Sequence, residues 1–161
     1  MARLHDLLKS FSTAMLVTHS SKGELRARPM AIVDVETSCR IWFITSDESA
    51  KIHEIERDTQ VLVTCQDGEK AHISLSGVAH LEKDRARIEQ VWKDSFKVWF
   101  PEGKTDPQIV LIGVELTEAE YWDNRGLNAV KYLGKAATAL LKKQTPKVSE
   151  GEEHGRIVNL P

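Results

Sequence analysis

The chain has 161 residues, a length typical of one domain, and its 22 basic and 24 acidic side chains give a formal net charge of −2. This balance excludes a strong positive field that would attract nucleic acids or anionic membranes, so any anion binding must be local. The apolar runs are shorter than the roughly 20 residues that cross a bilayer. Cys39 and Cys65 lie in apolar, strand-like segments, and no secretory signal is evident. We therefore expect a soluble, cytoplasmic protein with two reduced, buried thiols.

The first predicted elements are a helix and two strands. The helix has one apolar face, formed by Leu4, Leu7, Leu8 and Phe11. A strand over residues 14–18, a turn over 20–23 and a returning antiparallel strand over 25–35 follow. Pro29 lies in the returning strand and removes one ladder donor, which favours an edge or bulged position where backbone groups stay free for a ligand. A plain edge strand explains Pro29 equally well.

Residues 39–57 form the most informative stretch. A strand over 39–45 ends in the polar turn Ser46-Asp47-Glu48-Ser49, and a helix is predicted over 48–57. The turn gathers hydroxyls, backbone N–H groups, the positive end of a helix and the Lys51 ammonium, which are the donors that phosphate recognition requires. An ordinary capped helix with Lys51 in solvent would show the same local pattern. The pattern alone leaves both interpretations open.

The second half of the chain continues with strands. A mostly buried strand is predicted over 60–66 and a strictly alternating one over 71–82, in which Gly77 indicates a bulge or the close approach of another group. A helix over 84–93 leads into a loop over 94–107 that is rich in aromatic residues. This loop either belongs to the local core or forms a flap over a flat ligand or a subunit interface.

The last strong strand is predicted over 109–116, and it continues towards Tyr121 and Trp122. From Gly126 an amphipathic helix is predicted that ends at Lys142-Lys143, and residues 145–161 are expected to form a mobile polar tail. Residues 1–144 would then form the single domain.

Most common chemistries lack support in this sequence. His72 and His80 lie on one face of the strand over 71–82, about 26 Å apart along it, so no metal site is expected. No nucleophile elbow and no glycine-rich dinucleotide-binding turn are present. The polar turn with its lysine is the one remaining candidate site.

Five short segments, in this order and spacing, resemble the pyridoxamine 5′-phosphate oxidase-like flavoproteins, and the general stress protein branch most of all. They are Arg28-Pro29-Met30, the segment from Thr45 to Lys51, Ser74-Leu75-Ser76-Gly77, the loop Trp99-Phe100-Pro101 with Asp106-Pro107, and Glu120-Tyr121-Trp122-Asp123. The resemblance covers most of residues 4–123. It implies a mainly β fold of the α+β class, a six-stranded antiparallel split β-barrel flanked by helices, which binds FMN and forms a homodimer.

The resemblance also implies a set of cofactor-binding residues. Thr45, Ser46, Ser49 and Lys51 would bind the FMN phosphate, and Ala50 stands where the oxidases have an arginine. Arg28 would add a guanidinium to the phosphate, and the strand through Met30 and Ile32 would run along the flavin ring. His72 replaces a glutamine of the oxidases. Trp122 would lie at the flavin across the dimer interface.

One departure from the oxidases bears on activity. Their Arg-Leu-His-Asp-Arg run, which serves cofactor and substrate phosphates, corresponds here to Asn128-Ala129-Val130-Lys131-Tyr132. We therefore expect an FMN-dependent oxidoreductase of unknown substrate, with a stress connection suggested by its branch, that is not a true pyridoxamine 5′-phosphate oxidase. The alternatives are a flavin-binding or flavin-sensing protein without turnover and a related split barrel that uses haem or a deazaflavin. Apart from a small molecule, the expected partner is a second copy, with neither nucleic acid nor membrane.

Overall fold

The computed structural model describes residues 2–68, 70–125 and 154–158. The helices are α1 (Ala2–Lys9), α2 (Ala50–Arg57) and α3 (Arg85–Val91), and two 3₁₀ turns follow α3, η1 (Asp94–Val98) and η2 (Gly103–Thr105). The strands are β1 (Thr13–His19), β2 (Leu25–Val35), β3 (Ile41–Ser46), β4 (Gln60–Asp67), β5 (Ala71–Glu82), β6 (Ile109–Asp123) and β7 (His154–Val158). Within these ranges no helix is both long enough and apolar enough to cross a membrane.

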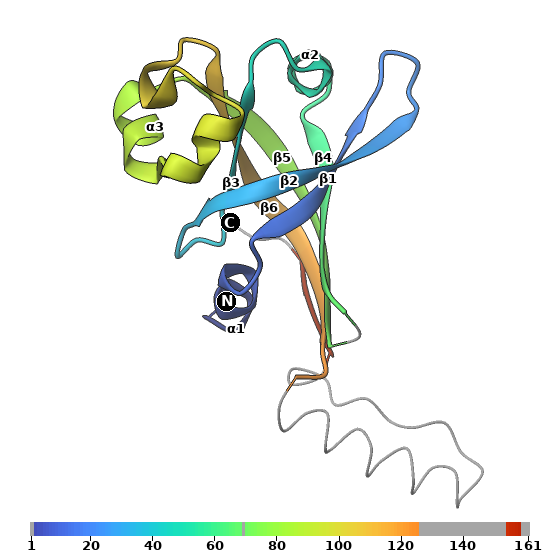
Figure 1. The fold of residues 1–161 in the computed structure, drawn as a ribbon. Helices are drawn as coiled ribbons and strands as arrows, with labels where there is room; N and C mark the ends of the chain where they lie inside the picture. Colours follow the sequence, from blue (N-terminus) through green and yellow to red (C-terminus); the bar gives the residue numbers. More distant parts are fainter. Residues whose placement is uncertain (1, 69, 126–153, 159–161) are drawn as a thin grey trace, which may run out of the picture.

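Six of the strands close into an antiparallel barrel, as the sequence predicts. Their order is β3-β2-β1-β4-β5-β6, and pairing between β3 and β6 completes the ring. The helices lie outside the barrel wall, with α2 at one end and α3 beside β3 and β6 (Figure 1). The predicted fold class, an α+β split barrel, is confirmed.

Strand β6 has different neighbours along its length. Its first half, from Ile109 to Val114, pairs with β3, whereas Glu118 to Trp122 pair with β7. On its other side β6 pairs with nearly all of β5, and the register shifts between Ser76 and Gly77. A Cβ on Gly77 would lie 2.5 Å from the carbonyl oxygen of Glu115, so only glycine fits without displacing backbone. The bulge and the close approach predicted at Gly77 are both present.

Two apolar clusters hold these elements together. The larger fills the barrel and includes Leu4, Leu7 and Leu8 from α1. The smaller joins the outer surface of the barrel to α3 and η1, and consists of Val33, Trp42, Ile44, Ile88, Val91, Phe96, Phe100, Ile109 and Leu111. Cys39 and Cys65 are buried thiols that form no disulfide, as predicted, and burial raises the pKa of both thiols, that of Cys65 to about 12.

The C-terminal part differs from the sequence-based expectation. The helix predicted from Gly126 and the substrate positions around Val130 lie outside the described residues. Residues 145–161 were expected to form a mobile polar tail, yet within that range His154–Val158 form β7. This strand pairs with the open edge of β6, where Gly155 lies against the ring of Tyr121 and Arg156 bonds the carboxylate of Glu118 at 2.6 Å. Backbone pairing, ion pairs and the packing of Ile157 against the larger cluster hold β7, and this short strand has only two large apolar residues, Ile157 and Val158.

Candidate cofactor-binding site

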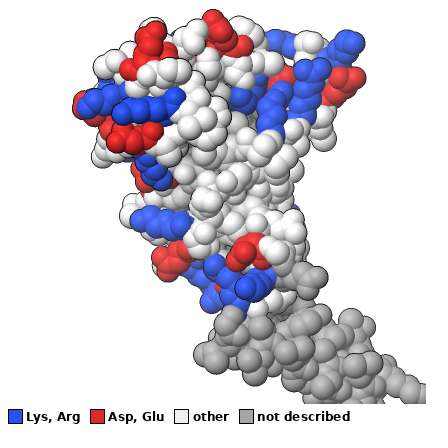
Figure 2. Space-filling model, in the orientation of Figure 1, with Lys and Arg blue, Asp and Glu red and all other residues white. Residues whose placement is uncertain are grey.

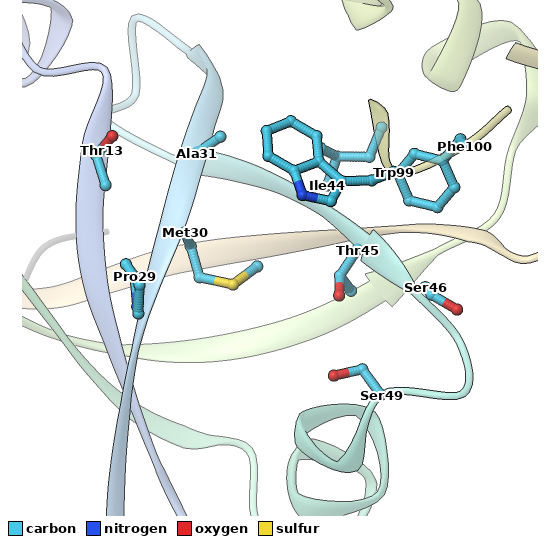
Figure 3. A pocket seen from close by; sticks show the side chains of 10 residues that line it. All are labelled: Thr13, Pro29, Met30, Ala31, Ile44, Thr45, Ser46, Ser49, Trp99 and Phe100. Carbon is cyan, nitrogen blue, oxygen red and sulfur yellow. The ribbon is translucent and has the colours of Figure 1, made fainter. Parts of the chain in front are cut away.

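A cavity of about 640 Å³ opens beside β2 and the end of β3. Its walls are mostly apolar. The hydroxyl groups of Thr45, Ser46 and Ser49 gather on one side, next to the start of α2, whereas that of Thr13 lies on the opposite side (Figure 3). The lining residues are Thr13, Pro29, Met30, Ala31, Ile44, Thr45, Ser46, Ser49, Trp99 and Phe100. Both the volume and an apolar wall with a few convergent polar groups are typical of small-molecule sites, which range from roughly 300 to 1,000 Å³.

The polar side of the cavity is built by the turn between β3 and α2. Ser49 is the N-cap of α2, but its side chain does not bond the helix N–H groups. Instead Lys51 Nζ donates to Ser49 Oγ and, at 2.9 Å, to Thr45 Oγ1. Ser46 Oγ accepts from the N–H of Glu48 at 3.3 Å, which is the only bond from a side chain to a backbone N–H that the structure shows within the turn over 46–49. Lys51 is 9% exposed, so the interpretation with a solvated lysine is wrong.

The charge of Lys51 is only partly compensated. Burial lowers the pKa of Lys51, the positive charge of Arg28 lowers it further, and the negative charge of Glu54 acts in the opposite direction. Within the part of the chain that the structure describes, no carboxylate lies within ion-pair distance of Lys51. A buried ammonium whose partners are two hydroxyls favours an anion in the adjoining cavity, because an anion would supply the missing charge.

Arg28, which the resemblance assigned to the phosphate, is bound elsewhere in this structure. Its guanidinium donates to Glu54 Oε2 at 2.6 Å and to Thr18 Oγ1 at 2.7 Å. Glu54 also accepts from Thr18 at 2.6 Å and from Arg26 at 3.4 Å. This network fixes α2, and with it Lys51, against β1 and β2. Arg28 does not line the cavity.

The other expected site residues divide into two groups. Met30, Thr45, Ser46 and Ser49 line the cavity, whereas Ile32 is buried in the barrel core. His72 and Trp122 face each other across the β5–β6 pair, in the part of β6 that also pairs with β7, and neither lines the cavity. Trp122 stacks on His154 of β7, with ring centroids 5.3 Å apart. One chain therefore does not bring these two residues to the cavity.

Sequence reasoning did not assign six of the lining residues to the site. They are Thr13, Pro29, Ala31, Ile44, Trp99 and Phe100. Thr13 pairs with Ala31 across β1 and β2, so they follow from strand register, which the local pattern does not fix. Trp99 and Phe100 belong to the aromatic loop, whose composition was the only signal of a contact there.

Comparison with known proteins supplies the family. The model of the family "Pyridoxamine 5'-phosphate oxidase like" matches residues 1–147. No curated protein matches the sequence significantly. A proposed general stress protein 26 from Jannaschia sp. CCS1 is similar in structure, with a TM-score of 0.73 and 23% identity over 98% of this chain and 99% of that one. The general stress protein 26 of Bacillus anthracis gives a TM-score of 0.66 and 22% identity over 74% of this chain and 91% of that one.

A third solved structure is nearer in sequence. The general stress FMN/FAD binding protein of Xanthomonas citri is 28% identical, with a TM-score of 0.66 over 78% of this chain and 92% of that one. The neighbours under 25% identity show the same fold, and the family match spans almost the whole chain. The chain thus belongs to the pyridoxamine 5′-phosphate oxidase-like family.

Proposed function

We propose that this protein binds FMN in the cavity beside β2 and β3. The observation that carries the proposal is the buried Lys51 ammonium, held by the Thr45 and Ser49 hydroxyls at one side of a largely apolar cavity. The family membership and the name of the Xanthomonas citri neighbour support the same cofactor.

The donor set fits a phosphate monoester. Lys51 has three N–H groups, and the Thr45, Ser46 and Ser49 hydroxyls and the first N–H groups of α2 can add further hydrogen bonds. The apolar wall formed by Pro29, Ala31, Ile44 and Phe100 suits a flat heteroaromatic ring. The hydroxyl groups and this wall border one space, so the phosphate and the ring of one ligand can be held at the same time.

The proposed activity is that of an oxidoreductase. Bound FMN supplies hydride transfer, and the protein's share is to bind the phosphate, orient the ring and exclude water. Apart from Lys51 beside it, no described residue of the cavity wall carries a cation that could hold a second phosphate. In the sequence, Asn128, Val130 and Tyr132 stand at the positions that bind the substrate phosphate in the oxidases, and these uncharged side chains support a substrate other than pyridoxamine or pyridoxine phosphate.

The same wall also supports the second candidate, a flavin-binding protein without turnover. None of the described residues that line the cavity is an acid, a histidine or another proton-transfer group. Reduction of the bound flavin by NADH or NADPH under anaerobic conditions separates the two candidates. The absorption spectrum of the purified protein separates both from a barrel that uses haem or a deazaflavin.

We also propose a homodimer in which Trp122 reaches the flavin of the partner. Trp122 is 38% exposed. On the face shown in Figure 2, the charged groups of both signs gather towards the ends, and the middle is largely uncharged. Such a surface fits contact with a second copy. Light scattering of the flavin-loaded protein should give the mass of two chains.

The decisive experiment compares FMN with riboflavin, which lacks the phosphate. Charge-assisted hydrogen bonds typically contribute about 1.5–3 kcal/mol, so Lys51→Ala should weaken FMN about tenfold or more in a fluorescence titration and leave riboflavin unchanged. Lys22→Ala is the matched control, because Lys22 is exposed in the turn between β1 and β2 and does not line the cavity. Equal affinity of the wild-type protein for FMN and riboflavin would refute the proposed phosphate site.

A further inference from the structure

The loop after α3 is firmly held by two phenylalanines. Phe96 and Phe100 are buried and pack against Trp92, with ring centroids 5.7 Å and 6.4 Å apart. The carbonyl of Phe96 accepts from the N–H groups of Trp99, at 2.9 Å, and Phe100, at 3.0 Å. Arg85 donates to two carbonyls further along the same loop. The backbone that carries Trp99 is therefore fixed.

The side chain of Trp99, by contrast, is 66% exposed although it lines the cavity. No aromatic ring in the described part of the chain packs against it. Phe100, the next residue, is 4% exposed and supplies the apolar anchor of the loop. Anchoring the loop thus does not require the Trp99 indole, and a large aromatic surface left in water at a cavity is typical of a ligand contact.

The position of the indole relates it to the anion site. In Figure 3 the indole lies beside Ile44 and faces the same space as Met30, while the hydroxyls of Thr45 and Ser49 border that space on another side. A ligand whose anionic group lies at the hydroxyls therefore has its remainder within reach of the indole. A fixed separation between an anion site and a flat aromatic surface selects ligands that contain both groups.

We propose that Trp99 is a specificity-determining residue that stacks on the heteroaromatic ring of the phosphorylated ligand. The inference rests on the proposed FMN site and adds a second point of recognition to it. Lys51 binds the phosphate and Trp99 stacks on the ring. The site consequently favours a ring-bearing phosphate over a simple phosphate or a sugar phosphate.

The test uses the full chain with two ligands, FMN and inorganic phosphate. FMN binding is followed by flavin fluorescence, and the affinity for phosphate is obtained from its displacement of FMN. Trp99→Ala should lower the affinity for FMN about tenfold, within the range found for heteroaromatic bases stacked on aromatic side chains. The dissociation constant of inorganic phosphate should stay unchanged. Trp99→Phe should restore most of the FMN affinity. Val98→Ala is the control, since Val98 is 79% exposed and does not line the cavity.

The possible results separate this inference from the proposed function. Failure of the wild-type protein to bind FMN refutes both. Normal FMN affinity in Trp99→Ala refutes only the stacking role, whether or not the variant changes mass in light scattering. Equal losses of FMN and phosphate affinity would mean that the loop has collapsed, and this too contradicts a role confined to the ring.

Discussion

The carboxylate of Glu54 provides the sharpest test of how α2 is held in place. It is buried and accepts from Thr18 and Arg28, both at 2.6 Å, and from Arg26 at 3.4 Å. Glu54→Gln keeps the volume and one acceptor oxygen but removes the charge and turns an NH₂ group towards a cation or a hydroxyl. The structure therefore predicts a loss of stability with a small change in shape.

The size of the loss follows from the partners. Hydrogen bonds to a charged group contribute about 1.5–3 kcal/mol each, and two of the three here are short. The Arg28 side chain is 23% exposed and recovers some hydration in the variant, whereas Thr18 is fully buried and does not. We expect a decrease in the free energy of unfolding of about 2 kcal/mol for Glu54→Gln, below the ~3–5 kcal/mol found when one partner of a buried ion pair is removed outright.

Urea unfolding, followed by tryptophan fluorescence, measures this difference. Burial raises the pKa of Glu54, but the hydrogen bonds from Thr18 and Arg28 and the charges of Arg28 and Arg26 outweigh burial and leave the pKa lowered. The stabilisation that Glu54 provides is then fully present at pH values above its ordinary pKa of 4.5, and it is lost as the pH falls through the lowered pKa of the folded state. The variant and the wild type should therefore converge in acid.

Glu56→Gln is the control for this measurement. Glu56 lies on the same helix, its side chain is 56% exposed and it pairs only with His53 among the described residues. Such a change should alter stability by no more than about 0.5 kcal/mol. A stabilising role of the Glu54 charge is refuted if both variants show the same small decrease in the free energy of unfolding. It is also refuted if the decrease in Glu54→Gln is the same at pH 7 and in acid.

Four further outcomes are expected. Lys51→Met should stabilise the ligand-free protein in urea near neutral pH. Burial and the charge of Arg28 lower the pKa of Lys51, so its charged form is costly in the folded state, and the gain in stability should shrink as the pH rises through that pKa. FMN affinity should fall over the same pH range, which a titration series would show. Gly77→Ala should lower Tm by several degrees, since the added Cβ meets the backbone of Glu115 and such strain costs about 1–3 kcal/mol. Gly155→Ala should detach β7, because the Cβ would lie 2.5 Å from the Tyr121 ring, and the NMR signals of Tyr121 and Trp122 should shift.

The barrel strands could be predicted because their residues alternate. The bounds expected for residues 25–35 and 71–82 agree with those of β2 and β5. In β5 more and less buried positions alternate from Ala71 to His80, whereas in β2 apolar and polar residues alternate only from Leu25 to Arg28. The expected helix over 48–57 begins later, at Ala50, because the backbone of Ser49 is extended. Local sequence patterns thus predicted the bounds of these elements to within a few residues.

The site was only partly predictable, for reasons of tertiary structure. The hydroxyls and Lys51 lie close together in sequence, and the structure brings them together as expected. The partner of Arg28 lies on α2, and its choice of Glu54 over a ligand depends on how that helix packs, which no local pattern encodes. β7 was missed for a similar reason, since an edge created by β6 decides its conformation.

Strand β6 pairs with three other strands, and this pairing affects how the protein unfolds. Both sides of this strand are paired, β5 along one side and first β3 and then β7 along the other. Its amides can therefore exchange with solvent only when neighbouring strands separate from it. The barrel and the segment beyond it depend on this one strand, so they should form a single cooperative unit, and the slowest-exchanging amides should lie in β6 near Ile112 and Val114, where the core is fully buried.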